Sequence, residues 1–166
     1  MTPKPYQVAG FDGAGTILQT GPDCTLPFQK GDKVFYSGSP IRQGSNAEYQ
    51  FVDERSVGHK PARLDMTQAA AMPLTYLTAY EALVERLQIP KGEKGAGLLI
   101  INGSGGVGSI ATQIARHLLG MEVVVTTASK PQKVQFSKDM GATHIVNHHG
   151  DLESQLRDLK LDVPLK

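Results

Sequence analysis

The chain has 166 residues, 40% of them hydrophobic, with 17 basic and 16 acidic side chains. This length allows one domain, or one domain and part of a second, and the balanced charge favours neither nucleic acid nor an anionic membrane as the main partner. The single cysteine, Cys24, excludes an intramolecular disulfide framework and a multi-cysteine zinc lobe. Residues 1–5 lack the apolar core of a signal peptide, and no apolar run reaches the ~18 residues of a membrane helix. We therefore expect a cytoplasmic protein.

The first part of the chain, residues 1–64, predicts a small β-rich unit. Glycine and proline are concentrated before residue 61, and short β-prone segments alternate with turn residues. These segments are 7–9, 16–18, 33–36 and 48–52. The pattern is typical of a small antiparallel barrel.

From Asp65 the pattern becomes helical. Thr67 is a candidate N-cap, and apolar residues then recur at three- and four-residue spacings as far as Leu87. We expect one or two helices here, followed by a loop over residues 89–95.

The last part, residues 96–166, predicts alternating strands and helices. The expected order is strand 97–102, helix 106–119, strand 122–127, helix 131–140, strand 143–147 and a short helix near 151–159. Ser129 and Pro131 stand where a helix should begin, and Gly120 and Gly141 where helices should end. The alternation implies an α/β fold with a parallel sheet and right-handed crossovers.

The turn between the first strand and the first helix of this part carries the most specific chemistry. Glycine lets the backbone turn tightly and approach a pyrophosphate, whose charge is met by N–H groups at the helix N-terminus. The alternative is a glycine-rich loop that binds no nucleotide. We predict that six residues of the turn bind a dinucleotide: Gly103, Ser104, Gly105, Gly106, Val107 and Gly108.

The end of the second predicted strand indicates which nicotinamide cofactor fits. NAD-specific sites usually place an acidic residue there to bind the ribose 2′-hydroxyl. Residues 126–130 contain no acid, whereas Ser129, Lys130 and Lys133 offer a hydroxyl and two cations that suit a 2′-phosphate. The sequence therefore favours NADP(H). Alternatively, Ser129 is only a helix cap and the two lysines are solvated surface charges.

Two adjacent histidines, His148 and His149, follow the third predicted strand. They stand at the edge where an adenine would lie, so His148 is a candidate neighbour of the adenine. Adjacent histidines can bind a metal, but a loop pair without a third ligand is more often unliganded. We predict no metal site.

Several segments, taken in their shared order, resemble the medium-chain dehydrogenase/reductase superfamily. Within it they are similar to the quinone-oxidoreductase (zeta-crystallin-like) branch, which includes zinc-type alcohol dehydrogenase-like proteins. Segments 8–17, 31–34 and 46–49 resemble the GroES-like barrel, and segments 69–74 and 77–80 resemble the helix that leads to the cofactor.

The resemblance implies a particular division of the chain. Residues 1–64 would be a partial GroES-like catalytic barrel, residues 65–95 connecting helices and a loop, and residues 96–166 the first half of an NADP-binding Rossmann domain, a partial doubly wound sheet.

The resemblance also implies a chemistry without zinc. In the zinc alcohol dehydrogenases of the superfamily, a histidine follows the glycine that corresponds to Gly10, and a cysteine lies four residues before the threonine that corresponds to Thr78. Phe11 and Leu74 stand at these places, and neither is a zinc ligand. The resemblance implies a zinc-free hydride transfer from NADPH to a quinone or an α,β-unsaturated carbonyl. Thr78 is the candidate residue near the nicotinamide, the alternative being an ordinary helix hydroxyl.

The resemblance begins inside the barrel and stops at residues 161–163, where a fourth sheet strand would begin. A chain truncated in this way would keep the adenosine and pyrophosphate contacts, lack a closed active site, and leave residues 98–101 as an open sheet edge. Two functions stay open: a reductase, active alone or as part of a longer parent, and a non-catalytic nucleotide-binding or vestigial product. A homodimer is expected only where the family's C-terminal part is present.

Overall fold

The structure is a computed structural model that describes residues 7–166. It has two compact units, the first ending at Leu74 and the second comprising Thr75–Lys166. Each unit is built around a three-stranded sheet of its own, antiparallel in the first and parallel in the second. The predicted order of a β-rich part followed by an α/β part is confirmed.

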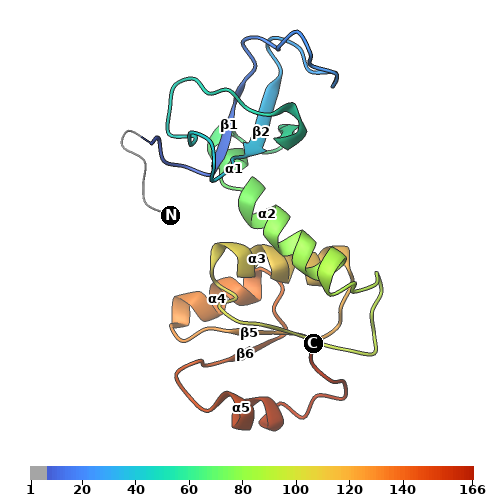
Figure 1. Cartoon of the computed structure of the whole chain (residues 1–166). Coiled ribbons are helices and arrows are strands. Elements are labelled where there is room, and N and C mark those ends of the chain that lie inside the picture. Colours follow the sequence, from blue (N-terminus) through green and yellow to red (C-terminus); the bar gives the residue numbers. More distant parts are fainter. Residues whose placement is uncertain (1–6) are drawn as a thin grey trace. The chain divides into compact units, whose positions relative to one another are not determined.

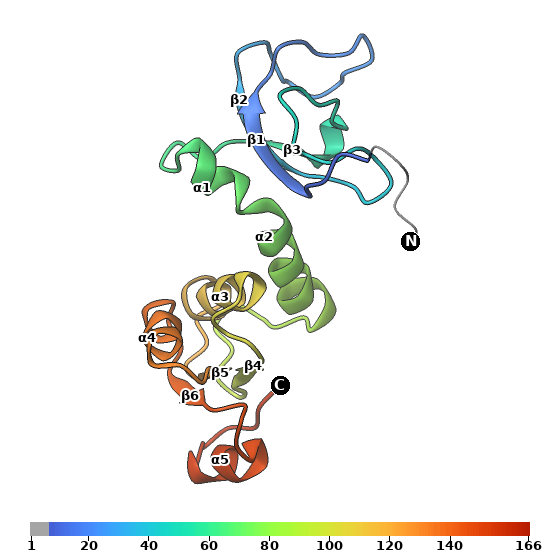
Figure 2. The ribbon, with the colours of Figure 1, turned by 90° about the vertical axis from the view of Figure 1, so that its left-hand side faces the viewer.

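The first unit contains the strands β1 (Asp12–Thr16), β2 (Lys33–Ser37) and β3 (Val57–His59), in that order across the sheet; Figure 1 labels β1 and β2, and Figure 2 labels all three. Gly13 pairs with Tyr36, and a Cβ at Gly13 would lie 2.4 Å from the Tyr36 ring. The 3₁₀ turn η1 (Glu54–Ser56) precedes β3, and α1 (Met66–Ala70) packs on β1.

Two strands predicted in the first unit do not form. Residues 7–9 and 48–52 lie outside the sheet, and β1 ends at Thr16 rather than continuing through residue 18. The Gly44 N–H donates to the carbonyl of Val8 at 2.8 Å, so the first segment bonds to a loop instead of to a ladder. In the second segment, the Gln50 side-chain amide donates to the Gln43 carbonyl at 2.8 Å.

The N-cap of α1 is Asp65, which corrects the prediction of Thr67. The Asp65 carboxylate accepts from the Gln68 N–H at 2.7 Å, and the Gln68 side-chain oxygen accepts from the Asp65 N–H at 3.1 Å. This reciprocal pair satisfies two backbone donors and places Thr67 inside the first turn.

The second unit contains the parallel strands β4 (Leu98–Ile100), β5 (Val124–Thr127) and β6 (His144–Val146), with β5 in the centre. Figures 1 and 2 show α3 and α4 on one side of this sheet and α5 on the other. Since sequential parallel strands are joined by helices, this is one half of a doubly wound sheet. Its helical segments are α2 (Pro73–Tyr80, which begins in the first unit), η2 (Glu81–Arg86, π-helical), α3 (Gly106–Gln113), η3 (Ile114–Leu118, π-helical), α4 (Pro131–Asp139) and α5 (Leu152–Asp158).

The predicted helix ends in the second unit are confirmed. Gly120 and Gly141 follow η3 and α4 with φ of 72° and 107°, in the left-handed region that glycine adopts without steric cost. The core lies between η2, β4 and the continuous helix α3–η3, and it includes Leu83, Leu98 and Ile114. No helix within residues 7–166 is long and apolar enough to cross a bilayer.

The outer side of β4 is paired at its start with residues 164–166, which corrects the prediction of an open edge over 98–101 for residues 98 and 99. Gly97 and Leu165 form a parallel bridge, and the Leu99 N–H donates to the Lys166 carbonyl at 3.0 Å. A Cβ at Gly97 would lie 2.8 Å from a Leu165 methyl, so glycine allows this close approach. The ammonium of Lys166 pairs with Glu93 at 3.1 Å.

Candidate functional site

The predicted site residues of the second unit follow the carboxyl ends of its three strands. Ile100 of β4 pairs with Thr126 of β5, and Thr127 of β5 pairs with Val146 of β6, so the three strands end at one edge. The segments that leave this edge are the turn 103–108, residues 128–130 and residues 147–149. Ligands of open α/β sheets bind at this edge.

The turn between β4 and α3 is tightly packed around three of its glycines. A Cβ at Gly103 would lie 2.4 Å from Cβ of Thr126, and a Cβ at Gly105 would lie 2.6 Å from the Asn102 side chain. At Gly108 it would lie 2.2 Å from the Asn102 carbonyl oxygen. The backbone of the turn therefore lies close to Thr126 of β5 at Gly103, and close to the Asn102 carbonyl at Gly108.

The N-terminus of α3 presents backbone N–H groups that no side chain caps. Its N-cap, Gly105, has extended dihedrals and gives no side-chain cap, and the first turn holds no acidic residue. The N–H groups of residues 106–108 have no acceptor within the helix, because the first intrahelical acceptor, the Gly105 carbonyl, is taken by Ser109 at 2.9 Å. These donors and the positive end of the helix dipole fit a phosphate group.

The segment after β5 presents two cations. The N-cap of α4 is Lys130, not Ser129, and Pro131 occupies the first turn. Ser129 therefore does not cap α4, which corrects the alternative that it is only a helix cap. Its side chain is half-buried. Lys130 and Lys133 are exposed, and neither takes part in an ion pair within residues 7–166.

The two histidines after β6 are exposed, with ring centroids 4.4 Å apart. Gln155 of α5 fixes the start of their loop, since its side chain accepts from the Asn147 N–H at 2.8 Å and donates to the Asn147 carbonyl at 2.9 Å. Across residues 7–166 the structure brings together no group of three His, Cys, Asp or Glu that could hold a metal ion.

Thr78 lies on α2 and is exposed. Thr75, three residues earlier, has its methyl group 3.1 Å from the Cβ position of Gly106, so α2 contacts the start of α3 there. Residues three apart share a helix face. Thr78 is thus on the face of α2 that meets the start of α3 at Thr75.

Comparison with known proteins identifies the family. The profile described as "Zinc-binding dehydrogenase" matches residues 106–163. A zinc-type alcohol dehydrogenase-like protein of Staphylococcus epidermidis is 50% identical over 158 residues, which are 93% of this chain and 46% of that protein. The quinone oxidoreductase of Escherichia coli, solved in complex with NADPH, superposes with a TM-score of 0.81 at 28% identity, covering 96% of this chain and 47% of that one. The chain belongs to the medium-chain dehydrogenase/reductase superfamily.

A plant relative adds to this comparison. The chloroplastic NADPH-dependent alkenal/one oxidoreductase of Arabidopsis thaliana is 35% identical over 162 residues, covering 94% of this chain and 40% of that protein. This medium-chain dehydrogenase/reductase chain spans about half the length of the curated relatives it matches.

The family's zinc site does not fit these residues. Phe11 and Leu74 present apolar side chains that are 51% and 41% exposed, and neither has a donor atom for zinc. Leu74 contributes instead through its backbone, whose N–H donates to the Asp12 carboxylate at 2.7 Å. Burial raises the pKa of Asp12 above its usual value, and the Leu74 N–H opposes this rise.

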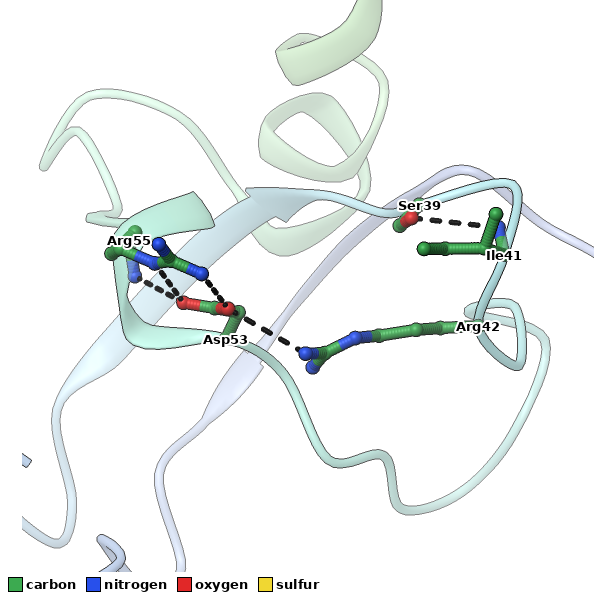
Figure 3. Close-up of polar contacts among 5 residues, drawn as sticks. All are labelled: Ser39, Ile41, Arg42, Asp53 and Arg55. Carbon is green, nitrogen blue, oxygen red and sulfur yellow. Dashed lines mark hydrogen bonds and ion pairs between the residues drawn. The ribbon is translucent and has the colours of Figure 1, made fainter. Parts of the chain in front are cut away.

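The first unit also has a hollow of about 230 Å³, beside which two arginines meet one carboxylate (Figure 3). Arg55 binds Asp53 through two N–H···O bonds of 3.0 and 2.8 Å, and Arg42 approaches the same carboxylate at 3.6 Å. The hydrogen bond from the Arg55 side chain is the largest of the effects that hold the pKa of Asp53 well below its usual range. Arg42 lies in the loop after β2, and Asp53 is the N-cap of η1. Their ion pair therefore joins this loop to η1.

Two residues that shape the turn were not predicted from the sequence, Asn102 before Gly103 and Thr127 of β5. Asn102 has a φ of 59°, and its N–H donates to Oγ1 of Thr127 at 2.7 Å. The dipeptide Asn102-Gly103 was the available signal for the first, because asparagine tolerates the left-handed conformation and Asn-Gly marks turns. Thr127 had no such signal, because it lies 25 residues away.

Proposed function

We propose that the chain binds NADPH at the carboxyl edge of β4, β5 and β6. The diphosphate would lie against the N-terminus of α3, bound by the turn Gly103, Ser104, Gly105, Gly106, Val107 and Gly108. The observation that carries this proposal is the glycine turn itself, whose backbone approaches β5 too closely for any side chain at Gly103. The same turn presents uncapped N–H groups.

The preference for NADPH over NADH rests on the residues after β5. A 2′-phosphate carries negative charge, which a carboxylate at this place would repel and the ammonium groups of Lys130 and Lys133 would attract. Ser129 adds a hydroxyl that is free of any capping role. His148, at the end of β6, would lie beside the adenine. Two of the relatives are named or solved with NADPH, which supports the same choice.

The reaction we propose is reduction of a quinone or an α,β-unsaturated carbonyl, by this chain or by a longer protein that contains it. Bound NADPH supplies the hydride, so the protein has to bind, orient and exclude water. Thr78, on the α2 face that meets the start of α3, is the candidate to line the nicotinamide end. No zinc is invoked, because Phe11 and Leu74 cannot ligate it. The single cysteine suits the reducing cytoplasm.

A second candidate is a nucleotide-binding protein without catalytic activity. It is favoured by the length of the match, because the chain covers 46% of the Staphylococcus epidermidis relative and the rest of that relative has no counterpart among these 166 residues. Both candidates use the same glycine turn.

One experiment separates the two. The purified chain is mixed with NADPH and 9,10-phenanthrenequinone, and the loss of nicotinamide absorbance is followed alongside NADPH binding by fluorescence. Turnover supports the reductase, and binding without turnover supports the non-catalytic protein. A folded chain that neither binds nor oxidises NADPH contradicts both.

A further inference from the structure

Asn102 is the pivot of the glycine turn. It has the left-handed φ of 59°, and its carbonyl accepts the Gly105 N–H at 2.9 Å. The same carbonyl oxygen and the Asn102 side chain fill the spaces that Cβ atoms at Gly108 and Gly105 would need. The position of Asn102 therefore sets how the backbone passes from β4 into the first turn of α3.

One hydrogen bond to the neighbouring strand, β5, fixes the backbone of Asn102. The Asn102 N–H donates to Oγ1 of Thr127 at 2.7 Å, and the Thr127 side chain is only 1% exposed. The bond is partly buried, because its acceptor belongs to a buried side chain, and it favours the left-handed turn over an extended continuation of β4.

The residue before it provides an internal contrast. Thr126 also belongs to β5 and is fully buried, yet its Oγ1 has no hydrogen-bond partner within residues 7–166. Thr126 meets the turn only by packing against Gly103. Of these two adjacent buried threonines, only Thr127 is hydrogen-bonded to Asn102, whereas Thr126 packs against Gly103.

We propose that Asn102 and Thr127 are positioning residues for cofactor binding, and this rests on the proposed function of the turn. Thr127 fixes the Asn102 backbone through its hydroxyl, and Asn102 fixes the N–H groups of residues 106–108 in the arrangement that receives a diphosphate. Neither residue touches the cofactor in this account.

The test compares isosteric threonine variants by NADPH titration, with the thermal midpoint of each variant as a second measurement. T127V removes the acceptor and keeps the shape, and we expect its dissociation constant for NADPH to rise about tenfold. T127S keeps the hydroxyl and is expected to stay within about twofold of the original chain. The matched control T126V is also expected to stay within about twofold, because the Thr126 hydroxyl has no partner to lose.

Equal NADPH affinity of T127V and the original chain would overturn the proposal, and so would a loss in T126V as large as that in T127V. If the original chain binds no NADPH, the proposed function itself fails. This result differs from equal affinity of T127V and the original chain, which refutes only the positioning role. Failure of T127V to fold would leave the decision to Asn102, which is exposed. N102G, which keeps the left-handed backbone, should bind about as well as the original chain, whereas N102A should bind several-fold more weakly. Equal binding by these two variants would also overturn the proposal.

Discussion

In the second unit, apolar side chains from η2, β4 and α3–η3 pack into one core, whereas within residues 7–74 only Val34 and Ala69 are buried hydrophobic residues. The first unit leaves large apolar side chains in solvent, among them Tyr49 at 75% and Phe51 at 99% exposure. Burial of apolar surface is the main stabilising term in folding. Most of the buried hydrophobic residues therefore lie in the second unit, and the proposed cofactor site lies entirely within it.

The first unit relies on polar contacts instead. Glu54 accepts from the Cys24 thiol at 2.9 Å, from the Leu26 N–H at 3.1 Å, and from both the N–H and the hydroxyl of Thr25. These bonds hold the loop before β2 against η1. Each exchanges a bond to water for a bond within the protein, so its net contribution is small. We therefore expect loss of polar contacts to affect mainly the first unit, and loss of apolar side chains to affect mainly the second.

The largest expected effect concerns the core of the second unit. Replacing Leu83, which is 4% exposed, by alanine should lower the free energy of unfolding of this unit by about 2–5 kcal/mol. The control is Leu26→Ala in the first unit, where the side chain is 41% exposed and the expected loss is within about 0.5 kcal/mol. Urea denaturation followed by circular dichroism measures both. Equal losses of unfolding free energy in the two variants would contradict the difference in core packing between the units.

A second prediction compares two glycines. Gly108→Ala should destabilise the second unit by about 1–3 kcal/mol, because the new methyl group would meet the Asn102 carbonyl oxygen at 2.2 Å. It should also weaken NADPH binding. The control, Gly15→Ala in β1, has nothing within 4 Å of its Cβ position and should change neither property. Thermal denaturation and NADPH titration test the pair, and NADPH binding that survives in Gly108→Ala would speak against the turn as the site.

A third prediction uses paired lysines in the two units. Lys130→Glu with Lys133→Glu should weaken NADPH about tenfold and leave NADH nearly unchanged, because only NADPH carries the 2′-phosphate. Lys30→Glu with Lys33→Glu has the same spacing and charge change in the first unit and should affect neither cofactor. Titrations at one fixed salt concentration compare the four combinations. Equal weakening of NADPH and NADH would refute the phosphate assignment.

The smallest expected effect is acid loosening of the first unit. The pKa of Glu54 is lowered, chiefly by its hydrogen bond from Cys24, from the ordinary value of 4.5. A carboxyl group with a lowered folded-state pKa stabilises the fold above its unfolded pKa, and this contribution is lost as the pH falls through the folded pKa. Hydrogen exchange should therefore show the Leu26 amide losing protection below about pH 4.5 while the Val125 amide of β5 keeps it.

The control for this titration is Glu54→Gln. Its side chain does not titrate, so protection of Leu26 should be lower at neutral pH and should change little on acidification. Simultaneous loss of protection at Leu26 and Val125 in the original chain would show that the two units open together.

The sequence allowed much of the second unit to be predicted, because local signals mark its elements. Glycines end its helices, Pro131 begins one, and the apolar strands alternate with helical periodicity. In the first unit, segments 7–9 and 48–52 have strand composition but lie outside the sheet, since a strand also needs a partner that composition does not specify. The cover of β4 by residues 164–166 depends on contacts distant in sequence. So does the bond from Asn102 to Thr127.

We propose above all that the second unit binds NADPH through the turn at Gly103–Gly108. The most direct measurement is a calorimetric titration of the folded chain with NADPH and, separately, with NADH. We expect saturable heat with NADPH and a weaker response to NADH. No heat with either nucleotide, on a sample shown to be folded by circular dichroism, would contradict it.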